Sequence, residues 1–436
     1  MSLEKFIEAA DKHEVFADRL DKVELDGCKF HFSAKDNLCS TEFQARAGSR
    51  ILEGYRPPFD ATPVKKMREA GGLLIGKTNM DEFGFGTFSV NSAYGIPKNL
   101  FDPQRSCGGS SGGAAAAACI IPGHVALGVS TGGSISCPAS FCGVVGFTPT
   151  YGRVSRYGLI DYGNSLDKVG ILSRTAKDVR RFLPVISGKD ERDPTSCTQP
   201  SLDMNGKVAE VAVPSELTQN ISAEVMSCFE NALKQLEDMG IKVRRISMPS
   251  LKYAIPAYYI LATSEASTNL ARYCGMRFGV MNEDFDKSFN EFFSKPRSEE
   301  FGDEAKRRVL LGTFSRMVGF RNKYYMKALQ VRQLIIREYN KVFEECDAVV
   351  SPTMPFIPKR FDEIASMAPL EIYQADFLTV PPNLTVMPHV SVPCGYHDNL
   401  PVGLQAVAAQ WNEGSLVEFA ENWESNFEYK FPEAVQ

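Results

Sequence analysis

Short apolar runs recur along the chain, and helical patterns separate them. Each run is four to six residues long, which is the length of a buried strand. They lie at residues 72–75, 208–213, 241–246, 347–350 and 402–407. Strands that alternate with helices are typical of α/β proteins, in which helices cover a central sheet. The pattern therefore predicts an α/β fold.

The longest apolar stretch, residues 112–129, approaches the length of a membrane span. A Pro-Gly-His sequence interrupts it, and alanine dominates its first half. Small side chains let a helix pack closely against a sheet, and the second half has the apolar continuity of a buried strand. We therefore predict a buried helix over 113–121 and a buried strand over 124–129, and no membrane span.

Three further segments organise the rest of the chain. The clearest helix is predicted over residues 221–240, where four apolar side chains share one face and Gly240 is suited to a left-handed stop. Residues 188–206 are polar and contain prolines, which predicts a surface connection between two halves. Long helical patterns dominate the chain from residue 253 onwards and predict a helical cap over the sheet.

The composition excludes several classes of protein. The chain has 436 residues, of which 44% are hydrophobic and 23% charged, with a formal net charge of −5, so it is neither disordered nor globally basic. Its 11 cysteines contain no Cys-x-x-Cys pair, which predicts reduced intracellular thiols rather than a disulfide framework or zinc knuckle. The 5 histidines lack the spacing of a metal site. No secretory or import signal is visible at the N-terminus.

A phosphate-binding motif is matched by residues 71–78, GGLLIGKT. A phosphate loop needs a strand before its first glycine and a flexible turn between the two glycines. Here a helical pattern comes before the motif and an apolar strand lies inside it. We therefore interpret Lys77 as a solvated residue at a strand end.

A serine-hydrolase elbow is matched by residues 128–132, GVSTG, directly after the predicted strand. This makes a hydrolase with Ser130 as nucleophile and His389 as base a competing hypothesis. An elbow turns directly into a helix, whereas this chain continues with two glycines and then a proline. We interpret His389 instead as a packed residue beside Pro388.

Two Gly-Gly-Ser turns, at residues 108–110 and 132–134, flank the predicted helix and strand. Glycine permits tight turns and close backbone approach, so the two turns can bring two serines and several backbone N–H groups together. That arrangement suits acyl-transfer chemistry. A purely structural role would explain either turn alone but explains both less well.

The segments that carry these turns resemble the amidase signature family, and within it the glutaminase subunits of glutamyl-tRNA(Gln) amidotransferases, known as A-type, in their shortened fungal mitochondrial form. The resemblance extends over nearly the whole chain, through FHFSAKDNLCS, GKTNMDEFGFG, both serine turns, KRRVLLGTF and VSVPCG. It implies one large α/β domain over residues 1–436, with a central twisted mixed sheet covered by helices and a helical cap over about 253–345. It also implies that the usual N-terminal helices of bacterial relatives are largely missing.

In this family a lysine and two serines form the catalytic triad, and the matching positions are Lys35, Ser110 and Ser134. The separations of 75 and 24 residues agree with the family pattern. The resemblance implies that Ser134 attacks the amide carbonyl, that Ser110, held through a cis peptide in relatives, relays the proton, and that neutral Lys35 is the final base. Burial must lower the lysine pKa from its ordinary value of about 10.4 for this role.

The resemblance also implies an oxyanion hole made by the backbone N–H groups of Thr131, Gly132 and Gly133 together with that of the nucleophile. Relatives usually read DTGGSIR in this segment. This chain has Ser130 in place of the aspartate and Ser136 in place of the arginine. Losing both members of a salt-bridging pair together avoids leaving one charge stranded.

In the amidotransferase branch, glutamine is held by its α-carboxylate and α-ammonium, which calls for an arginine fork and a carboxylate. The matching residues are Arg308 and Asp376, with Tyr258 or Tyr259 as a further contact. Without the resemblance, Arg308 would be interpreted as a solvated helix residue and Asp376 as a helix cap.

The activity implied is that of a glutaminase subunit within a glutamine-hydrolysing carbon–nitrogen ligase of protein biosynthesis. It passes ammonia to a B-type partner subunit, which converts Glu-tRNA(Gln) to Gln-tRNA(Gln) beside a small third subunit of F or C type. ATP and Mg²⁺ are then expected in the partner, and no cofactor in this chain. The expected location is the mitochondrial matrix, or else the cytoplasm of a prokaryote. A stand-alone amidase of small amides and a catalytically weakened scaffold remain alternatives.

Overall fold

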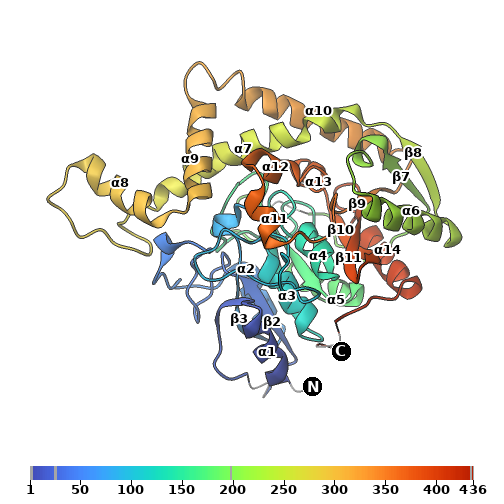
Figure 1. Ribbon diagram of the computed structural model, residues 1–436, viewed down its shortest axis with the longest axis horizontal. Coiled ribbons are helices and arrows are strands. Elements are labelled where there is room, and N and C mark those ends of the chain that lie inside the picture. Colours follow the sequence, from blue (N-terminus) through green and yellow to red (C-terminus); the bar gives the residue numbers. More distant parts are fainter. Residues whose placement is uncertain (1–2, 24–26, 197–198, 433–434, 436) are drawn as a thin grey trace.

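The computed structural model describes residues 3–23, 27–196, 199–432 and 435 (Figure 1). Its strands are β1 Phe16–Arg19, β2 Phe30–Lys35, β3 Gly72–Thr78, β4 Val125–Ser130, β5 Val145–Thr148, β6 Lys168–Ser173, β7 Glu210–Pro214, β8 Lys242–Ile246, β9 Ala348–Pro352, β10 His389–His397 and β11 Leu400–Val407. They form one 11-stranded sheet in the order β1-β3-β2-β4-β6-β5-β10-β11-β9-β7-β8. β2 runs parallel to β3 and β4, whereas β6 runs antiparallel to β4. The sheet is mixed, as predicted, and every predicted apolar run overlaps a strand.

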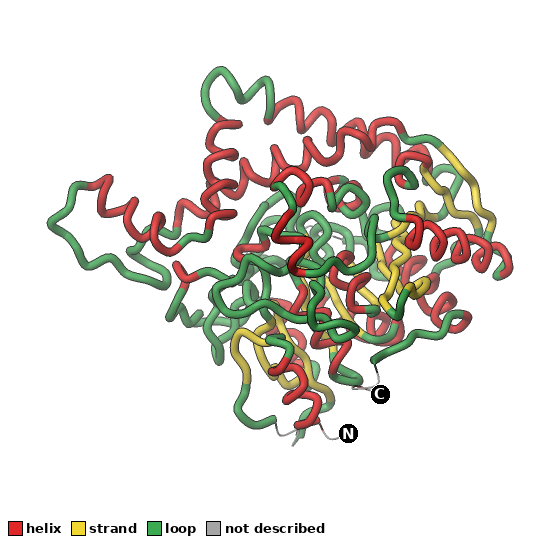
Figure 2. The backbone as a smooth tube through the Cα atoms, in the orientation of Figure 1, coloured by secondary structure: helices red, strands yellow, loops and turns green. Residues whose placement is uncertain are grey.

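The helices of the described residues cover this sheet (Figure 2). They are α1 Leu3–Lys12, α2 Thr62–Glu69, α3 Gly112–Ile120, α4 Ser136–Cys142, α5 Ala176–Ile186, α6 Ala223–Asp238, α7 Ala254–Asn269, α8 Phe289–Glu300, α9 Asp303–Arg316, α10 Tyr325–Val342, α11 Phe361–Ser366, α12 Pro369–Gln374, α13 Val380–Leu384 and α14 Glu413–Asn426. On one face, Phe182 of α5, Phe229 of α6 and Trp423 of α14 share a core with alternate strand residues. α3 and α4 pack on the opposite face with Ala126 and Leu172. The predicted α/β class is confirmed.

The apolar stretch after the first serine turn folds as predicted into a buried helix, α3, and a buried strand, β4. Every residue of α3 is buried, which requires small side chains. A Cβ atom on Gly113 would lie 2.6 Å from both Val15 O and Asn79 O. In the part of the chain that the structure describes, no helix meets the length and hydropathy needed to cross a membrane.

Two further sequence predictions hold. α6 buries Phe229 and Leu236 on one face, and Gly240 adopts the left-handed conformation after the helix, with φ of +83°. The described residues of the connection 188–206 contain no helix or strand.

Two local predictions are wrong. Lys77 is not solvated: it is fully buried, and its Nζ donates to Leu38 O at 2.5 Å and lies 3.8 Å from Asp36 Oδ1. β1 pairs with the outer side of β3, so β3 is not an edge strand and Lys77 is not at the edge of the sheet.

The second wrong prediction concerns the segment after the second serine turn. This segment is helical despite its proline, because Pro138 lies in the first turn of α4, where a backbone N–H is not needed.

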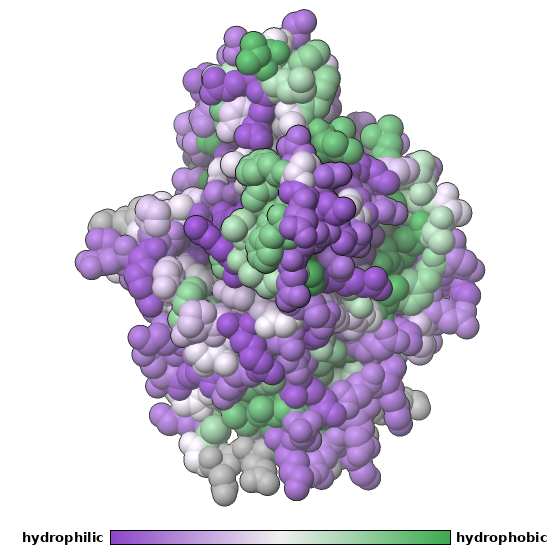
Figure 3. Space-filling view, turned by 90° about the vertical axis from the view of Figure 1, so that its left-hand side faces the viewer, coloured by the Kyte–Doolittle hydropathy of each residue, from purple (hydrophilic) through white to green (hydrophobic). Residues whose placement is uncertain are grey.

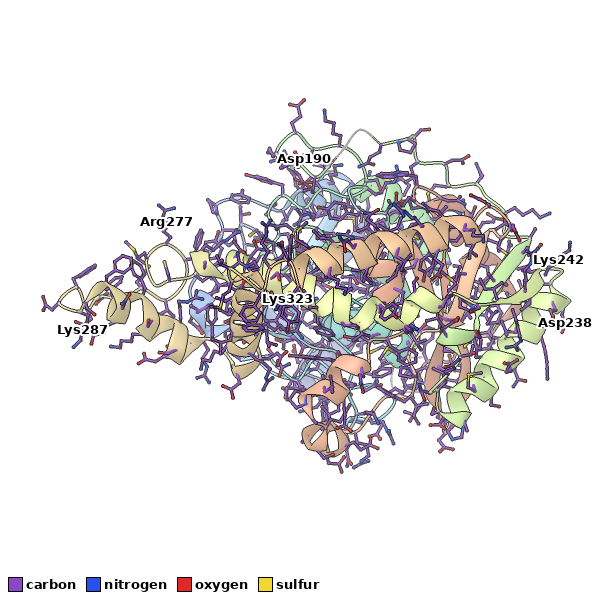
Figure 4. The ribbon with its side chains drawn as sticks, turned by 90° about the horizontal axis from the view of Figure 1, so that it is seen from above. Asp190, Asp238, Lys242, Arg277, Lys287 and Lys323 are labelled. Atoms are coloured by element: carbon purple, nitrogen blue, oxygen red, sulfur yellow. The ribbon has the colours of Figure 1, made fainter. Side chains whose placement is uncertain are left out.

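Helices α7 to α10 and their connections make up residues 254–342 (Figure 1). α8 projects as an arm from the rest of the molecule, and Lys287 lies at the outer end of this arm. Asp238 and Lys242 lie at the other end of the molecule (Figure 4). Large apolar side chains are exposed on α9 and just after it, including Leu310 at 71% and Val318 at 101%. The connection between α9 and α10 lies at the top of the molecule in Figure 1, and Figure 3 shows hydrophobic surface at the top as well. That this segment acts as a cap stays a prediction.

Candidate active site

Lys35 lies at the end of β2 and points into the protein. It is 1% exposed, and its Nζ donates to Ser110 Oγ at 2.7 Å and to Val129 O at 3.1 Å. Burial lowers the pKa of Lys35 to about 7, although the carboxylates of Asp81 and Asp167 oppose that shift. The lysine can therefore be neutral near physiological pH, which is the state a proton acceptor needs.

The first serine turn is held against a buried carboxylate. Asp81 Oδ2 accepts from the N–H of Ser89 and Oδ1 from that of Asn91, both at 2.9 Å. A Cβ atom on Gly109 would lie 2.3 Å from Asp81 Oδ2, so only glycine fits there. The peptide bond between Gly109 and Ser110 is cis. This packing directs the Ser110 hydroxyl toward Lys35.

The second serine turn connects β4 to α4 and contacts the first turn. Ser111 N–H donates to Ser134 O at 3.2 Å, so the structure brings the two Gly-Gly-Ser turns together. Ser134 is 7% exposed. Residues 131–134 belong to neither β4 nor α4, so their N–H groups lie outside both the sheet ladder and the helix. Such backbone groups are suited to stabilise an oxyanion.

Both glycines of the second turn are required by close packing. A Cβ atom on Gly132 would lie 2.4 Å from Tyr258 Oη, and one on Gly133 would lie 2.3 Å from Thr379 Oγ1. The neighbouring Thr131 hydroxyl donates to Asp167 Oδ1 at 2.7 Å. The candidate oxyanion hole is thus enclosed by side chains from α7, from the segment before α13 and from the residue before β6.

Arg308 is not the solvated helix residue that its pattern alone favours. It is 3% exposed, and its Nε donates to Glu304 at 2.8 Å and its Nη1 to Tyr162 Oη at 2.5 Å. Four aromatic rings surround its guanidinium at 5.0 to 5.5 Å from their centroids, those of Phe85, Tyr162, Tyr259 and Tyr373. A guanidinium held in this way has a fixed orientation, which recognition of a planar carboxylate requires.

Asp376 lies in the same cluster as Arg308. Its Oδ2 accepts from Thr87 Oγ1 and from Tyr259 Oη, both at 3.0 Å. Burial raises the pKa of Asp376 to about 7, and Arg308 acts in the opposite direction. The ring of Tyr258 packs edge-on against Tyr259 with centroids 5.0 Å apart. The structure therefore brings all the predicted substrate-binding residues to one place, although their roles stay predictions.

Three residues of this cluster were missed in the sequence. Glu304 has a recognisable signal, because it lies four residues before Arg308 on one helix. Tyr162 and Asp167 have no such signal, because both lie in the loop that ends at β6. Only the fold places Tyr162 beside Arg308 of α9 and Asp167 beside the serine turn.

The competing elbow hypothesis loses support. Ser130 Oγ donates to the side-chain oxygen of Asn383 at 3.1 Å, and Asn383 Nδ2 lies 3.3 Å from His389 Nε2, so an amide separates the serine from the histidine. His389 is fully buried and its Nδ1 lies 3.1 Å from Met387 O. It is a packed residue, as we interpreted it. Among the described residues no group of three or more metal-ligating side chains is present.

Ser136 is expected to tolerate loss of its hydroxyl. Its Oγ is buried, and it has no hydrogen-bond partner among the described residues. Because an unpaired buried hydroxyl costs desolvation energy, Ser136→Ala is expected to stabilise the folded chain by about 1 kcal/mol. Thermal unfolding measures this as a raised midpoint. A lowered midpoint would mean that the hydroxyl has a partner in solution.

Comparison with known proteins shows the family to which the chain belongs. The model of the family described as Amidase matches residues 4–417. The A-type chain of glutamyl-tRNA(Gln) amidotransferase from Archaeoglobus fulgidus is 44% identical over 406 residues, which cover 92% of this chain and 88% of the relative. That of Methanococcoides burtonii is 42% identical over 421 residues, which cover 95% and 88%.

A solved structure of a relative has a similar fold. The crystal structure of the A-type chain of glutamyl-tRNA(Gln) amidotransferase from Thermotoga maritima superposes with a TM-score of 0.83 at 36% identity, covering 100% of this chain and 93% of that one. The chain therefore belongs to the amidase family, and within it to the A-type chains of glutamyl-tRNA(Gln) amidotransferases.

Proposed function

We propose that the chain is the glutamine-hydrolysing subunit of a glutamyl-tRNA(Gln) amidotransferase. The observation that carries the proposal is the buried hydrogen bond of 2.7 Å from Lys35 Nζ to Ser110 Oγ. Burial lowers the pKa of this same lysine to about 7. The turn that holds Ser134 packs against it. The relatives named as A-type chains of this amidotransferase support glutamine as the substrate.

The chemistry is an acyl transfer in two halves. Ser134 Oγ attacks the side-chain amide carbon of glutamine and passes its proton through Ser110 to Lys35. Backbone N–H groups of residues 131–134 stabilise the oxyanion. The tetrahedral intermediate then collapses, the proton returns to the leaving nitrogen and ammonia departs. Water attacks the acyl-enzyme by the same relay and releases glutamate.

Substrate recognition follows from the two charges at the other end of the site. The hydrogen bonds of Arg308 use Nε and Nη1, so Nη2 is the nitrogen left for the α-carboxylate of glutamine. Asp376, once ionised, accepts from the α-ammonium. Both side chains are buried, where such charge-assisted contacts discriminate strongly against uncharged amides.

Partner subunits complete the reaction in this proposal. A B-type subunit receives the ammonia and, with ATP and Mg²⁺, amidates Glu-tRNA(Gln); a small F- or C-type subunit joins them. The exposed apolar side chains of α9 and the residues after it are of the kind that mark protein interfaces. The proposed location is the mitochondrial matrix, with a prokaryotic cytoplasm as the alternative. The free thiols of all ten described cysteines fit a reducing compartment.

An assay of the purified chain tests the proposal. Glutamine and propionamide are compared as substrates, and the chain is copurified from its source with any subunits bound to it. Preference for glutamine, together with an ATP-dependent, tRNA-binding partner, supports the proposal. Equal turnover of both amides without a partner would instead identify a stand-alone amidase, and absence of turnover in the complex would identify a scaffold.

Glutamine hydrolysis is expected to fall as the pH is lowered through about 7. Lys35 must be neutral and Asp376 ionised, and with pKa values of about 7 for both, each group reaches its active state only as the pH rises. Propionamide has no α-ammonium, so its hydrolysis depends on Lys35 alone and has a shallower acid limb. A pH profile of kcat/KM for both amides measures this. A flat profile from pH 6 to 8 would contradict it.

A further inference from the structure

Asp167 joins two parts of the site that are far apart in the sequence. The last pair of the ladder between β4 and β6 is Ser130 with Lys168, so Asp167 and Thr131 lie one step beyond it and face each other. Asp167 is 1% exposed, and its Oδ1 accepts the hydrogen bond of 2.7 Å from the Thr131 hydroxyl. One oxygen of this carboxylate is therefore bound to the turn that holds the candidate nucleophile.

The other oxygen binds a different segment. Asp167 Oδ2 accepts from the backbone N–H groups of Tyr162 and Gly163 at 2.8 and 3.0 Å. The same Tyr162 accepts from Arg308 Nη1 through its hydroxyl, and Asn269 Nδ2 donates to its carbonyl at 3.0 Å. The segment held by Oδ2 is thus the one that orients the guanidinium.

We propose that Asp167 is a positioning residue that sets the distance between the Ser134 turn and the Arg308 guanidinium. The inference rests on the proposed function, because the distance matters only for a substrate that contacts both. Glutamine spans from its reacting amide to its α-carboxylate, so an error of about 1 Å in that distance misplaces the carbonyl relative to Ser134. An amide without a carboxylate does not depend on it.

Thr131→Val tests this directly. Valine has the shape of threonine, leaves the backbone N–H groups in place and removes only the hydrogen bond to Asp167. The kcat for glutamine is expected to fall at least about 10-fold more than the kcat for propionamide, whose own loss measures any effect on the backbone N–H groups of the turn. KM for glutamine is expected to change less than about 3-fold. A role limited to the local shape of the turn would slow both amides equally, and that result, like no effect on either, would overturn the proposal.

Asp167→Asn provides a second measurement. The amide retains the shape and removes the charge that raises the pKa of Lys35, so the acid limb for propionamide is expected to shift to lower pH by about half a unit or more. Asp81 is the other carboxylate facing Lys35, and Arg156 and Asp161 are the charges that face Asp167. An unshifted limb would contradict an arrangement in which the Asp167 carboxylate lies near both Lys35 and the Ser134 turn, and would overturn the proposal.

Asp161→Asn is the matched control, because its carboxylate pairs with Arg272 at 3.3 Å and does not contact the turn. It is expected to leave both substrates and the acid limb unchanged. Failure of the proposal is distinguishable from failure of the proposed function. A wild-type chain that does not prefer glutamine rejects the function, whereas a normal preference with equal losses in Thr131→Val rejects only the role of Asp167.

Discussion

Ser134→Ala is expected to abolish glutamine hydrolysis, with kcat reduced by at least about 10⁴-fold. The variant lacks the oxygen that forms the acyl-enzyme, and Ser110 cannot replace it because its hydroxyl is held by Lys35 at 2.7 Å. Release of ammonia from glutamine measures the loss. Hydroxylamine added during turnover provides a second measurement, because it attacks the acyl-enzyme of the wild-type chain, frees the Ser134 hydroxyl and releases glutamyl hydroxamate, which the variant cannot form by this route.

Ser140→Ala is the control for this change. Ser140 lies on α4 within two turns of the nucleophile, and it is also buried, but it is not part of the serine turn. Its loss is expected to leave kcat within about 3-fold. Retention of more than about 1% of the activity in Ser134→Ala would exclude Ser134 as the nucleophile and would make Ser110 the candidate for that role.

Arg308→Lys is expected to lower kcat/KM for glutamine by about 100-fold or more and to leave propionamide within about 3-fold. Lysine keeps a positive charge for Glu304, so the buried carboxylate retains a cation. It lacks the planar fork that binds Glu304, Tyr162 and a ligand carboxylate at once. The measured quantity is the ratio of kcat/KM for glutamine to kcat/KM for propionamide, because a general loss of activity lowers both values and leaves this ratio unchanged.

Arg307→Lys is the matched control on the same helix. Arg307 also pairs with Glu304 and interacts with Tyr373, but its side chain is 42% exposed, whereas Arg308 is buried. Its replacement is expected to change neither substrate by more than about 2-fold. Equal losses for glutamine and propionamide in Arg308→Lys would contradict a carboxylate-binding role and would leave Arg308 as a packing residue.

Local patterns predicted most of the fold correctly. The alanine-rich helix α3, the strand β4 and the end of α6 at Gly240 follow from side-chain size, apolar continuity and glycine's access to positive φ, which are properties of a few neighbouring residues. The helix α4 was missed because a proline argues against a helix interior, and its place in the first turn is visible only in three dimensions.

The candidate site was predicted only in part. The two glycine-rich turns made Ser110 and Ser134 candidates, whereas Lys35 became a candidate only through the family resemblance. Neither pointed to Glu304, Tyr162 or Asp167, whose places beside the candidate site depend on contacts between the loop before β6, the serine turn and α9.

What the sequence by itself determined is the α/β class, the position of the serine turns and the residues available for the chemistry, since each depends on local composition. The tertiary structure decided the ionisation of those residues. Both Lys35 and Lys77 follow apolar segments, and both are buried, yet only Lys35 meets a serine hydroxyl, whereas Lys77 pairs with Asp36 and backbone carbonyls. The physical reason is that a pKa depends on desolvation and on charges brought near by the fold, and neither is a property of a residue's neighbours in the chain.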